Sequence, residues 1–405
     1  MNKITRKSFL KVLAATMVGG AAASALTGAA APVSIDETNG KVSRWVKNSL
    51  NPDGPLTIAK QGMFSSGGTV TAPVAGTYDA TTNWLDTTRA GNTAHVDHAN
   101  VLYQIPADSN GWPMVYLHGY GQSRMGWITT PDGRQGWADL FLRNGYSAFL
   151  VDQPRRGEAG STAQMSTDGF LDTWSADSKD YKPGDQAWYT HFRIGRVAPE
   201  RYEGSQFPEG DAAQNQFFRQ MTPNTGDFDQ AVAAAALGEV MKDVQTLTGH
   251  KSIFVTHSQG GPVGWFTLRK TKNIRAIVSY EPGGQVPFPE GQVPQEGQYV
   301  TRSNTSEGIE VSMDVFMSYT KIPILIYYGD NLPETDERPE LYEWTRRLHL
   351  MRKWATLLNE YGGDATVIHL PEIGLHGNTH FPFSDLNNVE VADHLSKWLY
   401  EKNLD

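Results

Sequence analysis

The sequence predicts an α/β protein in which a mostly parallel central β-sheet is covered by helices on both faces. Two observations point to this class. Short apolar runs of β-prone residues alternate with stretches of helical period along most of the chain. Several of these runs end abruptly in Gly, Asp, Glu or His, as strands do when functional loops follow them. Strands that alternate with helices favour a parallel sheet, because each helix carries the chain back across the sheet.

The elements follow in order along the chain. We expect strands at 93–105, 114–117, 147–151, 253–255, 276–280, 322–328 and 365–370. Helices are expected at 137–143, 228–247, 262–269, 341–361 and 388–402. Residues 32–55 are polar and contain three prolines, which is typical of a lead-in segment. Residues 56–72 alternate in polarity around a Gly-Gly pair and predict a β-hairpin.

Between residues 155 and 227 the regular period is lost. The stretch contains many aromatic residues among Asp, Gly and Pro, and it is too long for a simple strand-to-helix loop. We interpret it as a cap inserted over the active site. The alternative is a surface excursion with its own small apolar cluster. On either interpretation, residues 32–405 form one catalytic domain.

Composition excludes several classes of function. The chain has 405 residues, of which 39% are hydrophobic and 20% charged, values that are typical of a folded globular protein. Its formal net charge of −9 gives no electrostatic basis for nucleic-acid binding. There is no cysteine. Disulfides, thiolate zinc sites, a cysteine nucleophile and a lipoprotein anchor are therefore excluded.

The N-terminus has the pattern of an export signal. Lys3, Arg6, Lys7 and Lys11 precede an Ala- and Gly-rich stretch that extends to residue 31. The basic segment fits either a twin-arginine signal with Lys for the second Arg or an ordinary secretory signal. We therefore expect residues 1–31 to be removed and the mature protein to be periplasmic or secreted. No stable membrane anchor is expected after cleavage.

One turn carries the clearest chemical signal. Residues 253–261 read IFVTHSQGG, a short buried strand followed by Ser258 in a sharp turn and then by a helix. This arrangement is the nucleophile elbow of the α/β-hydrolase fold. Gly260 provides the small residue that the crowded turn needs, whereas Thr256 stands where Gly is usual. The N–H of Gln259, just after the proposed nucleophile, would point at the oxyanion.

A serine nucleophile needs a histidine base and an acid that orients it, and in this fold the chain order is Ser, acid, His. The loop after the last strand offers His376 and His380. Two carboxylates follow strands between Ser258 and this loop, namely Glu281 and Asp330. We favour Glu281, because Asp330 follows a glycine and Asp commonly stabilises such turns. Asp330 remains the alternative acid.

A second oxyanion donor is expected from the loop after residue 117, which reads His118-Gly119-Tyr120-Gly121. Its glycines allow the backbone to approach an acyl oxygen closely. We expect the N–H of Tyr120 to be this donor, with that of Gly121 as the alternative.

Several blocks in order resemble the "bacterial esterase" family of secreted α/β-hydrolases. They are KQGMFSSGG, LHGYGQSRMGWITTPDGRQGW, FLRNGYSAFLVDQPRRG, HSQGG, VSYEPG and LHGNTH followed by DLNNVEVAD. The resemblance extends over residues 56–399 and includes FRIG and QFP segments within the cap. It implies a Ser-Glu-His triad of Ser258, Glu281 and His380, which would select His380 over His376 and Glu281 over Asp330.

The sequence departs from the resembled family at one place. Members of that family have two adjacent cysteines after His-Gly, which form a vicinal disulfide, and this chain has Tyr120 and Gly121 there. Backbone donors could survive this change, but a Tyr side chain narrows or re-lines the acyl pocket. The family's substrate preference is therefore not transferred.

These observations predict a secreted serine carboxylic-ester hydrolase that acts on a small-molecule or polymeric ester through an acyl-enzyme. No metal or organic cofactor is implied. The alternatives are an acyltransferase or a lactone or amide hydrolase with the same triad, and a non-catalytic binding protein on a hydrolase scaffold. The oligomeric state cannot be read from the sequence.

Overall fold

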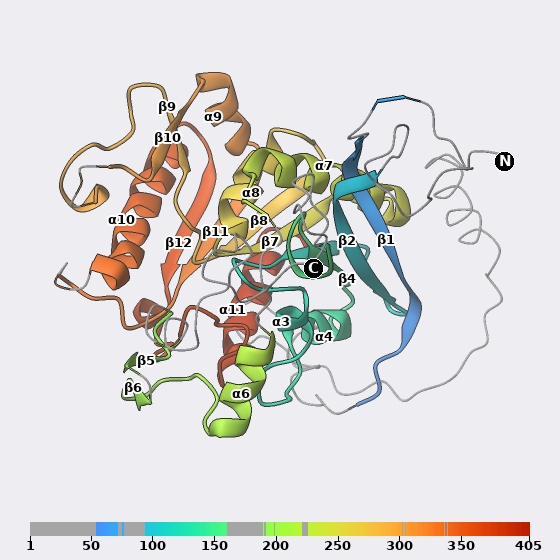
Figure 1. Cartoon of the computed structure of the whole chain (residues 1–405), viewed down its shortest axis with the longest axis horizontal. Helices are drawn as coiled ribbons and strands as arrows, with labels where there is room; N and C mark the ends of the chain where they lie inside the picture. Colours follow the sequence, from blue (N-terminus) through green and yellow to red (C-terminus); the bar gives the residue numbers. More distant parts are fainter. Residues whose placement is uncertain are drawn as a thin grey trace.

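The computed structural model describes residues 54–71, 75–76, 94–159, 189, 192–197, 199–220, 226–301, 303, 305–335, 337 and 339–405 (Figure 1). The predicted signal peptide, residues 1–31, lies outside this part of the chain, and so do residues 160–188 of the predicted cap. Among the described residues, no helix is long and apolar enough to cross a membrane.

An eight-stranded sheet forms the centre of the protein, with the strand order β1-β2-β4-β3-β7-β8-β11-β12. The first three strands in this order pair antiparallel, and all the others pair parallel. The bounds are β1 Ile58–Thr71, β2 Ala94–Pro106, β3 Pro113–Leu117, β4 Ser147–Asp152, β7 Ser252–His257, β8 Ile274–Tyr280, β11 Pro323–Tyr328 and β12 Asp364–His369. The mostly parallel sheet that the sequence predicts is confirmed.

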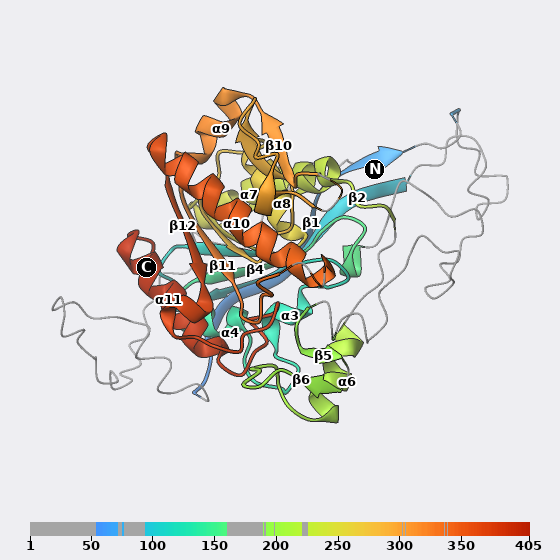
Figure 2. The same cartoon turned by 90° about the vertical axis from the view of Figure 1, so that its left-hand side faces the viewer.

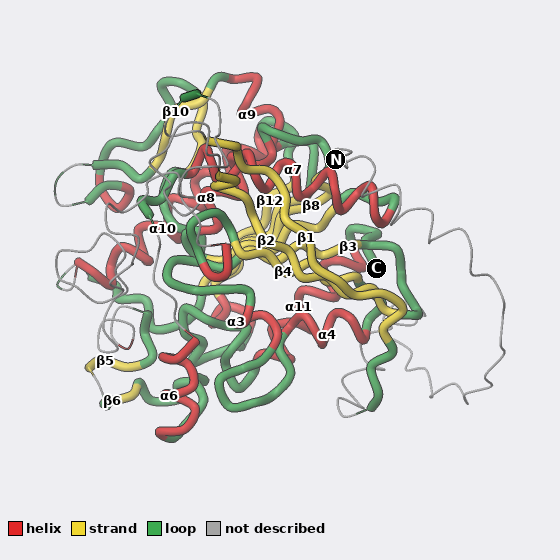
Figure 3. The backbone as a smooth tube through the Cα atoms, turned by 45° about the vertical axis from the view of Figure 1, so that its right-hand side comes forward, coloured by secondary structure: helices red, strands yellow, loops and turns green. Residues whose placement is uncertain are grey.

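Helices cover both faces of this sheet, as Figure 3 shows. Their bounds are α3 Met125–Ile128, α4 Trp137–Arg143, α7 Gln230–Thr248, α8 Gly260–Leu268, α9 Met313–Tyr319, α10 Pro339–Glu360 and α11 Asn388–Glu401. The alternation of side chains along β3 divides the core in two. Met114 and Tyr116 pack in the cluster that includes α4 and α11, whereas Val115 and Leu117 pack in the cluster that includes α7, α8 and α10.

The predicted hairpin at 56–72 is wrong. The segment is one continuous strand, β1, which pairs antiparallel with β2 along its whole length. Gly67 and Gly68 do not reverse the chain; they adopt φ values of 72° and 78° within the strand. A Cβ on Gly67 would lie 2.5 Å from Cα of Ala236 in α7, and one on Gly68 would lie 2.5 Å from the carbonyl oxygen of Val96 in β2. Gly67 therefore lets the strand pass close to the helix, and Gly68 lets it pass close to β2.

The described part of the predicted cap comprises a small antiparallel pair, β5 Gly195–Val197 and β6 Glu200–Arg201, and helix α6 Asp211–Gln220. Figure 1 and Figure 2 place these elements together at one end of the molecule. Phe207 and Phe217 of this segment are buried, and Phe217 contacts Phe381 with a centroid separation of 5.0 Å. The segment therefore packs on the loop that follows β12. Its role as a cap stays a prediction.

Two short strands and three 3-10 turns complete the described fold. Strands β9 Val286–Pro289 and β10 Gly308–Val311 form a parallel pair outside the main sheet. Single 3-10 turns occur at η1 Gly157–Ala159, η2 Gly297–Tyr299 and η3 Leu370–Ile373. Because β3, β7, β8, β11 and β12 run parallel, the loops that follow them meet at one edge of the sheet, where the candidate site lies.

Candidate active site

Ser258 occupies a strained turn between β7 and α8. Its φ of +52° is in the left-handed region that residues with a Cβ seldom adopt. The surroundings hold it there: its N–H donates to the carbonyl of Tyr280 at 3.0 Å, and its carbonyl accepts from the N–H groups of Gly261 and Gly283. A Cβ on Gly119 would lie 2.8 Å from Cβ of Ser258, so the neighbouring loop approaches this turn as closely as glycine permits.

The unusual Thr256 is accommodated by packing. Its hydroxyl lies 2.8 Å from that of Ser279 on β8, so the buried polar atom has a partner. A Cβ on Gly264 of α8 would lie 3.2 Å from the methyl group of Thr256. Helix α8 thus supplies the small residue that the strand lacks, and the elbow keeps its shape without the usual glycine.

Glu281 lies directly after β8 and is fully buried. Its Oε2 is 2.6 Å from Nδ1 of His380, and its Oε1 accepts from the N–H of Gly329 at 2.6 Å and from the guanidinium of Arg193. Burial raises the pKa of the Glu281 carboxyl, but the charges and hydrogen bonds of Arg193 and His380 outweigh burial and lower it. Glu281 is therefore ionised at neutral pH.

Contacts with neighbouring residues fix both the backbone and the ring of His380. Its backbone N–H donates to the carbonyl of Phe192 at 3.2 Å, and its carbonyl accepts from Nε2 of His257 at 2.8 Å. The Phe192 ring stacks on the imidazole with a centroid separation of 4.7 Å, and the Trp344 ring lies 4.2 Å away. With the ring held by Glu281 at Nδ1, the other nitrogen, Nε2, is the one available for proton transfer with a substrate or nucleophile.

The loop that carries His380 is anchored by a second buried carboxylate, Asp385. This side chain accepts from the N–H and the hydroxyl of Thr379, each at 2.8 Å, and from the amide of Asn378 at 3.1 Å. Burial raises the pKa of Asp385 to about 7, against the opposing effect of these hydrogen bonds. Residues 378 and 379 are thereby fixed immediately before His380.

The alternative acid and base, Asp330 and His376, lie next to each other and apart from the Glu281–His380 pair. Oδ2 of Asp330 accepts from the N–H of Gly377 at 2.7 Å and lies 3.7 Å from Nδ1 of His376. The side chain of His376 is 69% exposed, whereas that of His380 is 1% exposed. The structure therefore places Glu281, and not Asp330, against His380.

The loop after β3 lies against the Ser258 turn. The N–H of Gly119 donates to Oε1 of Gln122 at 3.2 Å, and Gly121 has a φ of +61°. Tyr120 is half-buried and packs against the apolar cluster that contains α4 and α11. Gln259 precedes the first residue of α8, and N–H groups at a helix start have no partner within the helix. The loop after β3 and the start of α8 therefore both lie next to Ser258, and the oxyanion donors that the sequence predicts in them stay a prediction.

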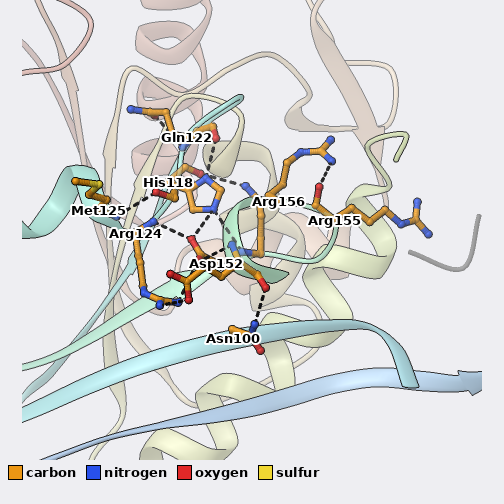
Figure 4. A network of polar contacts seen from close by, with 12 residues as sticks. Asn100, His118, Gln122, Arg124, Met125, Asp152, Arg155 and Arg156 are labelled. Carbon is orange, nitrogen blue, oxygen red and sulfur yellow. Dashed lines mark hydrogen bonds and ion pairs between the residues drawn. The ribbon is translucent and has the colours of Figure 1, made fainter. Parts of the chain in front are cut away.

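A polar network behind this loop escaped the sequence analysis (Figure 4). Asp152, fully buried at the end of β4, accepts from the backbone N–H and guanidinium of Arg124 at 2.8 and 2.9 Å. Arg124 also pairs with Glu158. His118 donates from Nδ1 to the carbonyl of Gly119 at 2.8 Å, and burial lowers its pKa, so its ring is neutral. Nε2 of His118 accepts from the N–H of Gln153, directly after β4, at 3.4 Å, so the network holds both ends of the loop against β4.

Two further residues of the site were missed. Arg193 belongs to residues 155–227, the segment that the sequence predicts as a cap (the cap segment), and it lies 88 positions before its partner Glu281, with no local pattern to link the two. Gly329 directly follows β11, at a position where glycine is an ordinary turn residue. Within the described part of the chain, no group of three or more His, Asp or Glu side chains is arranged to hold a metal ion.

Gly329 allows a direct prediction. A Cβ at this position would lie 2.5 Å from the carbonyl oxygen of Thr379 and 2.9 Å from Oε1 of Glu281, closer than real contacts allow. We expect Gly329→Ala to cost roughly 1–3 kcal/mol of stability through overpacking and to displace the Glu281–His380 pair. Thermal unfolding and activity measurements check this. Gly126→Ala is the matched control, because its Cβ would make only ordinary contacts, with Phe383 at 3.5 Å and Gln122 at 3.9 Å; equal losses in both variants would contradict the prediction.

The sheet order, the elbow at Ser258 and the loops at the carboxyl edge define an α/β-hydrolase. No family model matches the chain. A solved structure of a novel bacterial esterase is 30% identical in sequence and superimposes with a TM-score of 0.67, over 87% of this chain and 99% of that one. The chain belongs to the family of that bacterial esterase.

A curated relative is similar over most of its length. It is named "Probable secreted lipase phiG", comes from a fungal species (strain ATCC 74256), and is 26% identical over an alignment of 316 residues that covers 72% of this chain and 82% of that protein. The α/β-hydrolase fold that the sequence predicts is confirmed. The predicted enzyme class, a carboxylic-ester hydrolase, is confirmed at the level of the family.

Proposed function

We propose that the protein is an exported serine esterase that uses Ser258 as nucleophile, His380 as base and Glu281 as the acid that orients His380. The observation that carries this proposal is the 2.6 Å contact between buried Glu281 and Nδ1 of His380, beside the elbow that presents Ser258. A carboxylate in this position fixes the proton on Nδ1 and leaves Nε2 as the base.

The reaction would proceed in two halves. Nε2 of His380 takes the proton of the Ser258 hydroxyl as Oγ attacks the ester carbonyl carbon, and the negative charge moves to the carbonyl oxygen. Backbone N–H groups of Gln259 and Tyr120, with Gly121 as the alternative to Tyr120, would stabilise that oxyanion, each by roughly 3–4 kcal/mol. The alcohol leaves with the proton from His380, and water then releases the acid by the same steps.

The ester is proposed to be a small molecule or an accessible group of a polymer. Tyr120, half-buried in the loop after β3, would line the acyl side of the site. Export would follow from cleavage of residues 1–31, whose basic start and Ala-rich stretch have the signal pattern. The similarity to a relative named as a secreted lipase supports both parts of this proposal.

The test combines a probe and a substrate series. The mature protein is treated with a fluorophosphonate, the labelled peptide is identified by mass spectrometry, and hydrolysis of p-nitrophenyl esters from acetate to palmitate is measured with and without added alcohols. We expect Ser258 to be labelled, and the chain-length profile to give the size of the acyl site. Labelling without ester hydrolysis would point to a lactone or amide substrate, and net transfer to the alcohols to an acyltransferase. An unlabelled protein would be a binding protein.

A further inference from the structure

One arginine from the cap segment reaches the buried acid of the site. Arg193, in the described stretch before β5, is fully buried, and its guanidinium pairs with Oε1 of Glu281. Its Nε donates to the carbonyl of Asp330 at 3.0 Å, and its guanidinium carbon lies 5.7 Å from the centre of the Trp344 ring. Its backbone has a φ of +62°, so the chain is held in a strained conformation at this point.

The preceding residue contacts the other partner of the pair. Phe192 stacks on the His380 ring with an angle of 14° between the planes, and its carbonyl accepts from the His380 N–H. Two consecutive residues of the cap segment thus contact the two residues that would act together behind Ser258. A segment that only covered a substrate site would have no need for a charged side chain at this depth.

The permanent charge of Arg193 has a definite electrostatic effect. Glu281 alone would stabilise a protonated His380 strongly, because the carboxylate is buried where charges interact with little screening. A guanidinium on the opposite side of the carboxylate cancels part of that field at His380. It also keeps Glu281 ionised without requiring His380 to supply the balancing positive charge.

We propose that Arg193 is a positioning residue for the Glu281–His380 pair, supplied by the cap segment, which keeps His380 unprotonated and ready to accept a proton at mildly acidic pH. The proposal rests on the proposed triad. Arg193 touches neither the substrate nor the reacting atoms; it acts through Glu281. The cap segment would on this basis be part of the catalytic machinery.

Other titratable groups surround the pair and must be separated from this effect. Among the described residues, those that interact electrostatically with Glu281 or His380 include His257, Tyr328, His369 and Asp385. Burial lowers the pKa of His257 and raises that of Tyr328, and both shifts move these groups away from the range of a histidine base. Asp385, with a pKa of about 7, titrates within that range. Its contribution is measured with Asp385→Asn.

The test is the pH dependence of kcat/KM in neutral variants of Arg193. In Arg193→Met, the acid limb of the profile is expected to move to higher pH by about one unit or more, because loss of a nearby positive charge raises the pKa of the His380 imidazole. Arg193→Gln keeps hydrogen-bond donors without the charge, so it gives the same readout if the Met variant does not fold. Arg193→Lys is expected to return the acid limb to its wild-type pH. Free guanidinium added to Arg193→Ala is expected to have the same effect.

Arg347→Met is the matched control. Arg347 is a largely buried arginine that pairs with Glu307 at 2.7 Å and lies 4.5 Å from the same Trp344 ring, but it does not pair with Glu281. Its loss should lower stability without moving the acid limb. The inference fails if the acid limb of kcat/KM in Arg193→Met and Arg193→Gln lies at the wild-type pH. It also fails if the shift of this limb vanishes in the Asp385→Asn background.

The rate of fluorophosphonate labelling of Ser258, followed against pH, distinguishes this failure from failure of the proposed function. Labelling that is independent of Glu281 would refute the triad itself. Labelling that needs Glu281 but has the same pH dependence with and without Arg193 would refute only the role of Arg193.

Discussion

Ser258→Ala is expected to lower kcat for ester hydrolysis by roughly 10⁶-fold, as removal of the nucleophile does in other serine hydrolases. Ala cannot form the acyl-enzyme, whereas the oxyanion donors and the substrate contacts remain. The residual rate should therefore still exceed that of the uncatalysed reaction. The measurement is steady-state hydrolysis of the best p-nitrophenyl ester, together with loss of fluorophosphonate labelling.

The backbone conformation of Ser258 leads to a second prediction, which concerns stability. A residue with a Cβ at φ +52° costs about 1–2 kcal/mol relative to glycine. Ser258→Gly should therefore unfold at a higher temperature than Ser258→Ala, although both are inactive. Circular dichroism melting curves of the two variants provide the comparison. An active Ser258→Ala enzyme would contradict the assignment of Ser258 as the nucleophile. If Ser258→Ala does not fold, the activity of Ser258→Gly tests the assignment instead.

The elements that could be predicted from the sequence are those fixed by local pattern. The strand at 253–255, the turn at Ser258 and the helix after it follow one another without a gap, and they are observed as β7 and α8. The helix predicted at 228–247 is observed at Gln230–Thr248, where the Asp229 side chain caps its start by accepting from Ala231 and Val232. Such signals lie within a few residues of the element that they define.

The parts that could not be predicted depend on long-range contacts or on ambiguous residues. The contact of Arg193 with Glu281 spans 88 positions, and that of Arg124 with Asp152 spans 28. Arginine and aspartate are common on surfaces, so nothing in the sequence distinguishes these buried ones. The pair Gly67-Gly68 predicts a hairpin wrongly, because glycines with positive φ occur in hairpin turns as well as in strands that pass close to a helix or a neighbouring strand.

Glu281→Gln is expected to lower kcat by roughly 10⁴-fold, because it forces His380 into the wrong tautomer. Oε1 of Glu281 accepts from both Gly329 and Arg193, so the amide oxygen of Gln would stay on that side. The amide NH₂ would then face Nδ1 of His380 and donate to it. The ring proton would move to Nε2, which could no longer accept the proton of Ser258.

Asp330→Asn is the matched control for this change. Its Oδ2 accepts from Gly377 and its Oδ1 from the N–H of Asn331, and neither oxygen contacts His380. We expect this variant to keep most of the activity. The reverse result, an inactive Asp330→Asn beside an active Glu281→Gln, would show that Asp330 is the acid.

The measured loss in Glu281→Gln must also be separated from unfolding. Removing the carboxylate leaves the Arg193 charge buried without its partner, which typically costs about 3–5 kcal/mol. Activity is therefore compared at a temperature below the melting transition of every variant. In the double variant Arg193→Met with Glu281→Gln no charge is left unpaired, so much of the stability should return. Activity should stay low, because the tautomer of His380 is still unspecified. If stability returns in the double variant and activity does not, loss of stability does not explain the loss of activity in Glu281→Gln. Glu281 then has a role in the reaction itself.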